Sequence, residues 1–527
     1  MPDVFRFSLK TRRELEGTIH SSLALRTVRA CLLTTRDRDY AFSLAREIAV
    51  GQSISLYHFT ASGCYSYEPG KGAWTSHFAE DSLDAYSLLR KVQALRRSAL
   101  VILEDVLSGL SDKTGDGRAR VLLAHLLSAN PSRFGLVLLF LESRGSEIHL
   151  PSILADQFVR LDIPSPRGEE LENIAREEIA GCLCRGRPSP AVEQVRALAS
   201  RLGPELAGLT RSAARDALRD ALLFESGDLD RACEYLSGRK WDLLRRELAM
   251  NILDNAEVEQ PIGLDFLVEY VKIHRKRMSE WGSTRARGIL LIGPPGTGKT
   301  MLARAIGKLA GLPVIEFRLS SLMNSLLGET ERHFMLAFDT FAAMSPNVVF
   351  IDEIEKAFGD SSERDGGTMM RCTGALLTWL SDNTCPNFVV ATSNSLQRMG
   401  DVGLTLTRSE RFDAVFFVDV PCLAARSRML REWLQPHIPN AGFVADEIAA
   451  TTEKFSGADL RSAVKLAVSR AEFEGAPLTA AMLEGEMDRK RPRAIALYSQ
   501  FEGLRRWAAT FCEPAGPSEG DSVPIQT

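Results

Sequence analysis

The sequence predicts an α/β fold built as a three-layer sandwich with a C-terminal helical lid, preceded by a second, degenerate unit of the same plan. In the second half, short apolar runs bounded by turn residues alternate with helix-like stretches, as fully buried parallel strands do. These runs are Gly288–Ile292, Val314–Phe317, Val348–Ile351, Phe388–Ala391 and Val415–Val420. After Pro421 the pattern becomes helical, which predicts a small all-α lid.

The first half shows a weaker form of this pattern. Its strand-like runs are Ala30–Thr34, Ser53–His58, Leu100–Leu103, Leu136–Leu141 and Phe158–Ile163. Helix-like segments follow from Gly168 to about Tyr235, where a lid would lie. We interpret the halves as divergent copies of one unit, with two unrelated α/β domains as the alternative.

Composition excludes several classes of protein. The 527 residues include 64 Lys+Arg and 68 Asp+Glu, and the net charge of −4 argues against a nucleic-acid coat or a membrane-surface protein. Nine scattered cysteines form no disulfide framework, which favours a reducing compartment. The longest apolar run, Leu136–Leu141, is far shorter than the ~20 residues that cross a bilayer. We therefore expect a cytoplasmic protein with no membrane partner.

The main chemical motif is GPPGTGKT at Gly293–Thr300, directly after the Gly288–Ile292 strand and before a helical stretch. This is the context of a P-loop, in which glycines let the backbone wrap around phosphate oxygens. Lys299 would reach the β- and γ-phosphates, and the Thr300 hydroxyl would bind Mg²⁺. The predicted cofactor-binding residues here are Gly293, Pro294, Pro295, Gly296, Thr297, Gly298, Lys299, Thr300 and Met301.

Polar residues also follow the next two strands of the predicted sheet. In VVFIDEIEK, a buried strand brings Asp352 and Glu353 to the sheet edge where α/β folds bind ligands. Asp352 suits the Mg²⁺ shell, and Glu353 suits orientation or deprotonation of the attacking water. Asn394 ends the following strand and could hold that water; the alternative is an asparagine that caps a turn.

Two arginines in TRSERFD, Arg408 and Arg411, are ordinary surface residues on the simplest interpretation. They become candidates for catalysis because a phosphoryl-transfer transition state is stabilised by guanidinium charge, which a neighbouring subunit can supply.

These motifs, in this order and together with FSGADL at Phe455–Leu460, resemble the AAA branch of the AAA+ ATPases over about residues 255–475. The resemblance implies an ATP and Mg²⁺ site with Asn394 as the sensor-1 residue and Arg408 and Arg411 as fingers acting across a subunit boundary. It also implies nucleotide contacts from the lid and the adenine-side segment, namely Gly457, Ala458, Ile262 and Gly263.

A narrower likeness spans nearly the whole chain. The run from Met370 to Pro421 and the closing RAIALYSQFEGLRRWA resemble the hypothetical chloroplast reading-frame (ycf) type of AAA ATPase of cyanobacteria, plastids and bacteria. The pattern of strand-like and helix-like runs, with which the layout of that family agrees, predicts a degenerate nucleotide-binding domain at 1–167, a lid-like segment at 168–237, a linker at 238–285, the ATPase core at 286–421, the helical lid at 422–512 and a disordered tail at 513–527. The likeness also allows the plastid stroma as the location.

Several positions depart from the AAA pattern. Where a first P-loop should stand, TTRDRDYAFS has no glycine or lysine, and Asp37 and Asp39 would repel phosphate. We therefore expect no ATP site in the first half and interpret Glu104-Asp105 as a relic. The pore-loop position, Ser325–Glu329, lacks the usual aromatic residue, and Glu410 replaces the usual glycine before Arg411.

The leading hypothesis is Mg²⁺-dependent ATP hydrolysis coupled to remodelling of an unidentified client protein by a homo-oligomeric ring, expected to be a hexamer. The alternative is a nucleotide-gated scaffold with slow hydrolysis. A weaker third hypothesis, a nucleic-acid motor, rests on the basic stretches HRKRM and DRKRPR alone. No histidine lies in an HExxH motif, which argues against a built-in zinc protease.

Overall fold

The computed structural model describes residues 4–68, 73–78, 83–110, 116–128, 134–143, 154–183, 192–224, 229–254, 258–319, 329–357, 366–394, 406, 408 and 410–518. The chain divides into two compact units. The first comprises Met1–Leu243 with Leu326–Met344, and the second comprises Leu244–Ser325 with Ser345–Thr527. Helix α12 (Glu329–Ala343) therefore belongs to the first unit, although it precedes a strand of the second.

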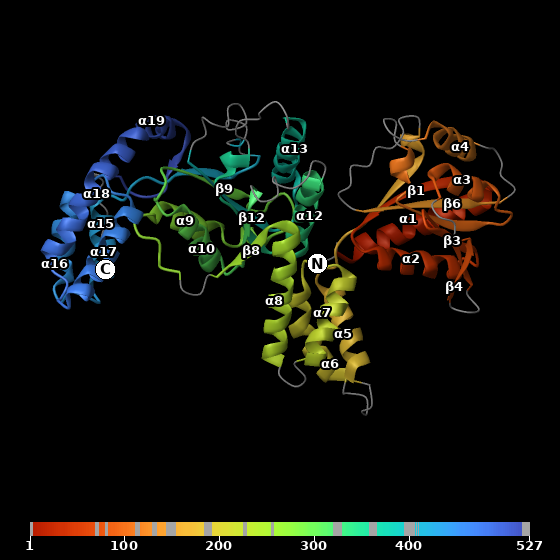
Figure 1. Cartoon of the computed structure of the whole chain (residues 1–527), viewed down its shortest axis with the longest axis horizontal. Coiled ribbons are helices and arrows are strands. Elements are labelled where there is room, and N and C mark those ends of the chain that lie inside the picture. The colour runs from red at the N-terminus through yellow and green to blue at the C-terminus, as the bar shows by residue number, and fades with distance from the viewer. Residues whose placement is uncertain are drawn as a thin grey trace. The chain divides into compact units, whose positions relative to one another are not determined.

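The first unit contains a seven-stranded sheet with the order β4-β3-β2-β5-β6-β1-β7 (Figure 1). Its strands are β1 (Val28–Thr35), β2 (Ser55–Thr60), β3 (Gly63–Glu68), β4 (Ala73–Phe78), β5 (Ala99–Glu104), β6 (Leu136–Ser143) and β7 (Phe158–Ile163). The pairs β2–β5, β5–β6, β6–β1 and β1–β7 are parallel. Strands β3 and β4 extend the sheet beyond β2 as an antiparallel hairpin.

Both faces of this sheet are covered. Successive side chains of a strand point to opposite faces, and in these strands both sets of side chains are apolar. Along β1, Ala30 and Leu32 join one core, and Cys31 and Leu33 join the other. The helices that pack on these faces are α1 (Val4–Leu25), α2 (Arg38–Gly51), α3 (Ala85–Gln93) and α4 (Gly117–Ser128), with short 3₁₀ turns η1 (Leu107–Leu110) and η2 (Ala155–Gln157). The result is the expected three-layer sandwich.

A helical bundle with its own core follows in the first unit. It is formed by α5 (Glu169–Leu183), α6 (Val192–Leu202), η3 (Gly203–Leu206), α7 (Arg211–Phe224) and α8 (Leu229–Leu248). This bundle occupies the place in the sequence at which we predicted a lid-like segment.

The second unit has a sheet with the order β14-β13-β9-β12-β11-β10-β8. Its strands are β8 (Met250–Leu253), β9 (Gly288–Ile292), β10 (Val314–Phe317), β11 (Asn347–Ile351), β12 (Asn387–Ser393), β13 (Ala414–Phe417) and β14 (Glu513–Pro514). Its core helices are α9 (Asp265–His274), η4 (Arg277–Ser279), α10 (Lys299–Ala310), η5 (Ile354–Ala357) and α13 (Gly366–Asp382). All pairs are parallel except β8 with β10.

The two sheets share one topology. The central order β2-β5-β6-β1-β7 of the first unit matches β10-β11-β12-β9-β13 of the second, strand for strand in chain order. A local detail is repeated as well: Asp105, after β5, and Glu353, after β11, both have a positive φ, of 54° and 49°. Such angles are uncommon outside glycine. The repetition supports our interpretation of two divergent copies.

The lid of the second unit has five helices, drawn in blue in Figure 1. They are α15 (Leu423–Leu434), α16 (Ala441–Thr451), α17 (Gly457–Glu474), α18 (Ala480–Gln500) and α19 (Glu502–Phe511). Leu430, Ile448 and Leu460 meet in a core that is separate from the sheet. At the start of α17, Ser456 and Asp459 form a capping box, which fixes the beginning of this helix.

Three segments differ from the sequence-based expectation. The expected linker, 238–285, contains β8 and α9, and β8 forms the edge of the sheet by pairing with β10. The closing run RAIALYSQFEGLRRWA is divided between two helices, since α18 begins at Ala480 and ends at Gln500 and α19 begins at Glu502. The expected disordered tail is ordered through residue 518, since β14 pairs with β13 and Ala515 is 2% exposed.

Among the helices of the described ranges, none combines the length and the apolar character that crossing a bilayer requires.

Candidate nucleotide-binding site

The loop between β9 and α10 follows a path that requires glycine. Gly296 and Gly298 have φ angles of 83° and 91°, a region that side chains with a Cβ rarely adopt. A Cβ on Gly293 would lie 2.0 Å from the carbonyl oxygen of Val418. The loop therefore turns tightly into the N-terminus of α10, where free backbone N–H groups attract anions.

Lys299, the first residue of α10, is buried beneath this loop. Its Nζ donates to the carbonyl oxygens of Gly293 and Pro294, each at 2.8 Å. Burial lowers the pKa of Lys299 to about 8, against the opposing effect of the nearby carboxylates, first that of Asp352. The ammonium group is thus held close to the loop by neutral partners, and a phosphate group would compensate its buried charge.

The carboxylates predicted from sequence lie next to Thr300. The Thr300 hydroxyl donates to Asp352 Oδ2 at 3.4 Å. Thr392, a fully buried residue of β12, donates to Asp352 Oδ1 at 2.5 Å and accepts from the backbone N–H of Glu353 at 2.9 Å. Thr392 therefore positions both acidic residues, a role that sequence reasoning missed although the residue lies in the predicted ATSN motif.

Asn394 lies at the end of β12 and contacts Glu353. Its Nδ2 donates to Glu353 Oε1 at 3.2 Å, and its backbone N–H donates to Glu355 Oε1 at 3.0 Å. Asn394 Oδ1 is buried and has no hydrogen-bond partner among the described residues. An unsatisfied buried acceptor is costly, so a water or ligand group is expected to contact this atom.

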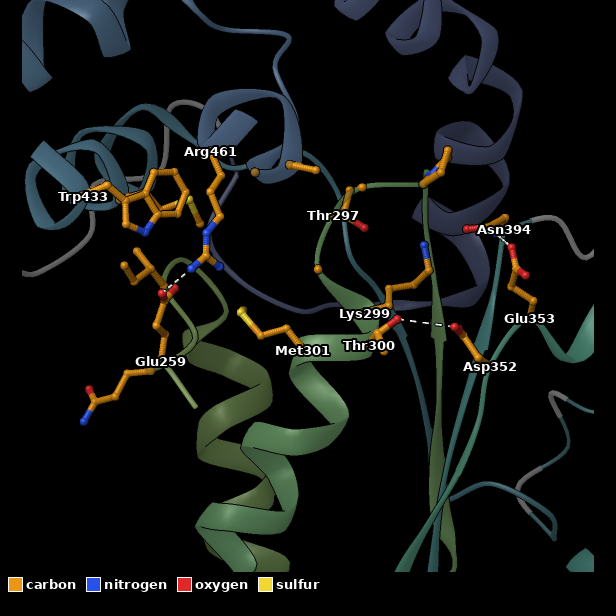
Figure 2. Close-up of a pocket in the computed structure, with 18 residues that line it drawn as sticks. Glu259, Thr297, Lys299, Thr300, Met301, Asp352, Glu353, Asn394, Trp433 and Arg461 are labelled. Carbon is orange, nitrogen blue, oxygen red and sulfur yellow. Dashed lines mark hydrogen bonds and ion pairs between the residues drawn. The ribbon is translucent and has the colours of Figure 1, made fainter. Parts of the chain in front are cut away.

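Lys299, Thr300, Asp352, Glu353 and Asn394 line one cavity of about 390 Å³ (Figure 2). The predicted residues in its lining are Ile262, Pro295, Gly296, Thr297, Gly298, Lys299, Thr300, Met301, Asp352, Glu353, Asn394, Gly457 and Ala458. The predicted residues outside its lining are Gly263, Gly293, Pro294, Arg408 and Arg411. A hydroxyl, a carboxylate and an ammonium group at one end suit a phosphate chain with a hard divalent cation.

The lid contacts the loop directly. The backbone N–H of Ala458, in the first turn of α17, donates to Gly296 O at 3.1 Å. The first turn of the lid helix and the loop thus meet beside the cavity, whose lining includes Gly457 and Ala458.

The cavity lining also contains residues that sequence reasoning missed, namely Glu259, Gln260, Met429, Trp433 and Arg461. Of these, Glu259, Trp433 and Arg461 lie at the end away from Asp352 and Glu353 (Figure 2). Arg461 Nη2 and Glu259 Oε1 form an ion pair of 2.6 Å, and the Arg461 guanidinium lies 5.7 Å from the Trp433 ring centroid (Figure 2). Apolar and aromatic groups with a few polar partners suit a nucleobase. No motif marks these residues, which come from three separate segments.

Arg408 is exposed and Arg411 is half-buried, and their roles as fingers require a second subunit. Burial and then the charge of Arg408 lower the pKa of Arg411, whereas Glu410 opposes this shift. The pore-loop position Ser325–Gly328 lies outside the described residues.

The corresponding sheet edge of the first unit is neutralised by its own side chains. Arg38 binds Glu104 and, at 2.8 Å, Asp105. His58 Nε2 lies 2.8 Å from Glu104 Oε2 and lowers the pKa of Glu104 by this hydrogen bond. The acidic pair that we interpreted as a relic therefore has internal partners, the cationic Arg38 and the imidazole of His58.

Glu142, at the end of β6, makes the first unit sensitive to pH. It is 7% exposed and accepts from the backbone N–H of Leu107. Burial raises the pKa of Glu142 to about 7. The charges of Asp105 and Glu104 add to this shift, whereas the Leu107 hydrogen bond and the charge of Arg38 oppose it. An unfolded glutamate titrates near about 4.3. The folded state therefore keeps a proton that the unfolded state releases, so stability falls as pH rises from about 4 to 7.

We expect Glu142→Gln, which keeps an acceptor for Leu107 and removes the buried charge, to stabilise the protein on the order of 3 kcal/mol at pH 8 and little at pH 4.5. Thermal unfolding at both pH values measures this. The exposed Glu47→Gln serves as a control, and equal shifts at both pH values would contradict the expectation.

Comparison with known proteins agrees with this geometry. Residues 289–420 match the family model described as "ATPase family associated with various cellular activities (AAA)". The "Uncharacterized AAA domain-containing protein ycf46" of Trieres chinensis is 32% identical over 255 residues, which is 47% of this chain and 51% of the relative. That of Gracilaria tenuistipitata var. liui is 27% identical over 380 residues, 69% of this chain and 74% of the relative.

A rice protein (Oryza sativa subsp. japonica), the "ATP-dependent zinc metalloprotease FTSH 9, chloroplastic/mitochondrial", is 33% identical over 227 residues, 43% of this chain and 29% of the relative. The chain thus spans about half the length of the first ycf46 relatives and less of the protease. Lys299, Thr300, Asp352, Glu353 and Asn394 lie within the matched residues, whereas Glu259, Trp433, Gly457, Ala458 and Arg461 of the cavity lining lie outside them. Residues 289–420 therefore match the AAA family, in a chain that resembles the ycf46 AAA domain-containing proteins.

Proposed function

We propose that the chain binds ATP in this cavity and hydrolyses it with Mg²⁺. The observation that carries the proposal is the convergence of Lys299, Thr300, Asp352 and Glu353 at one end of a cavity whose other end suits a base. The match to the AAA family, which is described as a family of ATPases, supports the same conclusion. The printed name of the rice relative, an ATP-dependent enzyme, is consistent with it.

Thr300 and Asp352 would hold Mg²⁺, which when bound neutralises charge on the phosphates. Lys299 would exchange its loop carbonyl partners for phosphate oxygens. Glu353 would accept the proton of the attacking water after Asn394 releases its carboxylate. Asn394 is then free to orient that water. Each of the side chains named in these steps lines the cavity.

We further propose that hydrolysis drives remodelling of a client protein by a ring of identical subunits, with six as the expected number. Support comes from Arg408 and Arg411, which lie outside the lining of their own subunit's cavity and could serve a neighbouring one. The ycf46 relatives are consistent with a location in the plastid stroma, the alternative to the cytoplasm.

A second candidate function is a nucleotide-gated scaffold with slow hydrolysis. The hydrogen bond between Asn394 and Glu353 favours it, since it holds the carboxylate away from a water until it is broken. The nucleic-acid hypothesis has less support, because the basic stretches make internal contacts: Arg277 donates to Thr284 O and Lys490 to Ser462 Oγ.

The test measures phosphate release from ATP by the full chain, with Mg²⁺ and after removal of the metal by EDTA. We expect hydrolysis with Mg²⁺ and its loss with EDTA. Lys299→Ala should lose ATP binding, whereas the matched Lys308→Ala on the same helix, whose Nζ donates to Val258 O, should retain it. ATP binding without multiple turnover would favour the scaffold, and absence of ATP binding would contradict both functions.

A further inference from the structure

The first unit joins its sheet to its helical bundle at the place where the second unit has its phosphate loop. β1 and β9 hold the same position in their sheets. Only Arg36 and Asp37 separate β1 from α2, whereas Gly293–Gly298 separate β9 from α10. Without glycine and with two residues, the first loop is too short to wrap around a phosphate group.

Asp37 lies against the start of helix α7 and is 4% exposed. Its Oδ2 accepts from the backbone N–H of Arg211 at 2.6 Å, and its Oδ1 accepts from Ser212 Oγ at 3.1 Å. Arg211 Nη1 lies 3.4 Å from Oδ2. A helix N-terminus, a hydroxyl and a guanidinium are the groups with which proteins bind phosphate. Here they bind carboxylates of the same chain: that of Asp37, and also those of Asp39, through Ser212 Oγ at 3.1 Å, and of Glu170, through the Arg211 guanidinium.

The second unit makes the corresponding contact without a side chain. There the loop residue Gly296 offers its carbonyl oxygen to Ala458 N, in the first turn of α17, and the cavity opens beside them. In the first unit, the loop residue Asp37 reaches the first turn of α7. In both units, therefore, the loop after the equivalent strand is bound to the first turn of a lid helix. In the first unit this contact is made by the charged side chain of Asp37.

Further contacts hold this arrangement. Arg211 is 5% exposed, and its guanidinium also contacts Glu170 and the carbonyl oxygen of Pro164 and lies 4.1 Å from the ring centroid of Tyr40. Beside Asp37, Arg36 Nη1 donates at 3.2 Å to Thr340 Oγ1 in α12. Side chains on both sides of the loop thus secure separate helices of the first unit.

We propose that Asp37 is a built-in substitute for a phosphate anion, which locks the lid-like bundle of the first unit in its closed arrangement without nucleotide. The carboxylate occupies the anion site that Arg211 and Ser212 form, so the first unit does not open and close with nucleotide binding. The unit serves as a rigid base that also holds α12. This inference concerns the first unit alone and does not depend on ATP hydrolysis by the second.

The test uses Asp37→Ala in the full chain and thermal unfolding with increasing inorganic phosphate at constant ionic strength. Loss of the carboxylate leaves Arg211 short of a buried partner, and we expect the melting temperature to fall by about 5 °C or more. Phosphate should occupy the vacated site and raise the melting temperature of Asp37→Ala by about 3 °C or more beyond its effect on the unchanged chain. Any phosphate bound at Gly293–Thr300 is common to all variants, so its effect on the melting temperature cancels when a variant is compared with the unchanged chain.

The control is Asp156→Ala, which removes an exposed acidic residue from the same unit and should show no added response to phosphate. If Asp37→Ala does not fold without phosphate, refolding that requires phosphate and fails in chloride supports the lock. Asp37→Asn, which keeps the shape and loses the charge, provides a folded intermediate case. Wild-type stability of Asp37→Ala, or a phosphate response equal to that of Asp156→Ala, would overturn the proposal.

Discussion

Glu353→Gln is expected to retain ATP binding and to lower turnover by roughly 10²–10⁴-fold, the usual contribution of a general base. The amide can keep the hydrogen-bonding shape next to Asn394 but cannot accept a proton from water. Single-turnover phosphate release measures the effect, and equilibrium binding of ATP shows that the site is intact. A pull-down with this variant and ATP should retain a client that the unchanged chain releases.

The matched control is Glu355→Gln, two residues further on. Glu355 is buried and accepts from the backbone N–H of Asn394, a bond that a glutamine oxygen can keep, so this change removes a nearby buried charge and leaves the proton acceptor Glu353 in place. We expect a smaller loss of turnover than for Glu353→Gln. If Glu353→Gln hydrolyses ATP at the unchanged rate, Glu353 is not the base and the proposed mechanism is wrong.

Much of the second unit could be predicted because its elements follow local rules. The bounds of β9 agree with the sequence prediction, since this strand is a wholly apolar run, and α17 begins at a capping box within the FSGADL motif. β8 and β14 could not be predicted in this way. Each is short and partly exposed, and each becomes a strand only through pairing with β10 or β13.

The two ends of the cavity differ in the same respect. The phosphate end is encoded in contiguous motifs, so Lys299, Thr300 and Asp352 could be identified without a structure. The opposite end depends on contacts between distant segments, such as the pair of Arg461 with Glu259, which are 202 residues apart. No local pattern indicates that such residues meet.

Asp37 shows the limit of an argument from charge. We expected an aspartate in a degenerate loop to repel phosphate, which agrees with its chemistry. Its bond to Arg211, 174 residues away, could not be predicted because neither residue belongs to a motif. Only the fold shows that this negative charge has a cationic partner.

Arg411→Ala is expected to lower ATP turnover by roughly 10³–10⁵-fold while leaving ATP binding intact, if its guanidinium stabilises the transition state in a neighbouring subunit. The physical reason is that charge builds on the transferred phosphoryl group only during the reaction, so an arginine outside the lining of its own cavity affects turnover and not binding. Arg408→Ala should show whether the exposed arginine shares this role. Arg428→Ala, an exposed lid arginine paired with Glu432, is the control and should have normal turnover.

Mixing two inactive variants distinguishes action across a subunit boundary from action within one subunit. Arg411→Ala subunits keep Glu353, and Glu353→Gln subunits keep Arg411, so a mixed assembly contains junctions at which both residues are intact. We expect the mixture to recover hydrolysis that neither variant shows alone, in proportion to the fraction of such junctions. Sedimentation of each variant with ATP must show that it still assembles. Normal turnover of Arg411→Ala, or no recovery in a mixture that does assemble, would contradict a finger role in trans, because the intact Arg411 and Glu353 would then have met without effect.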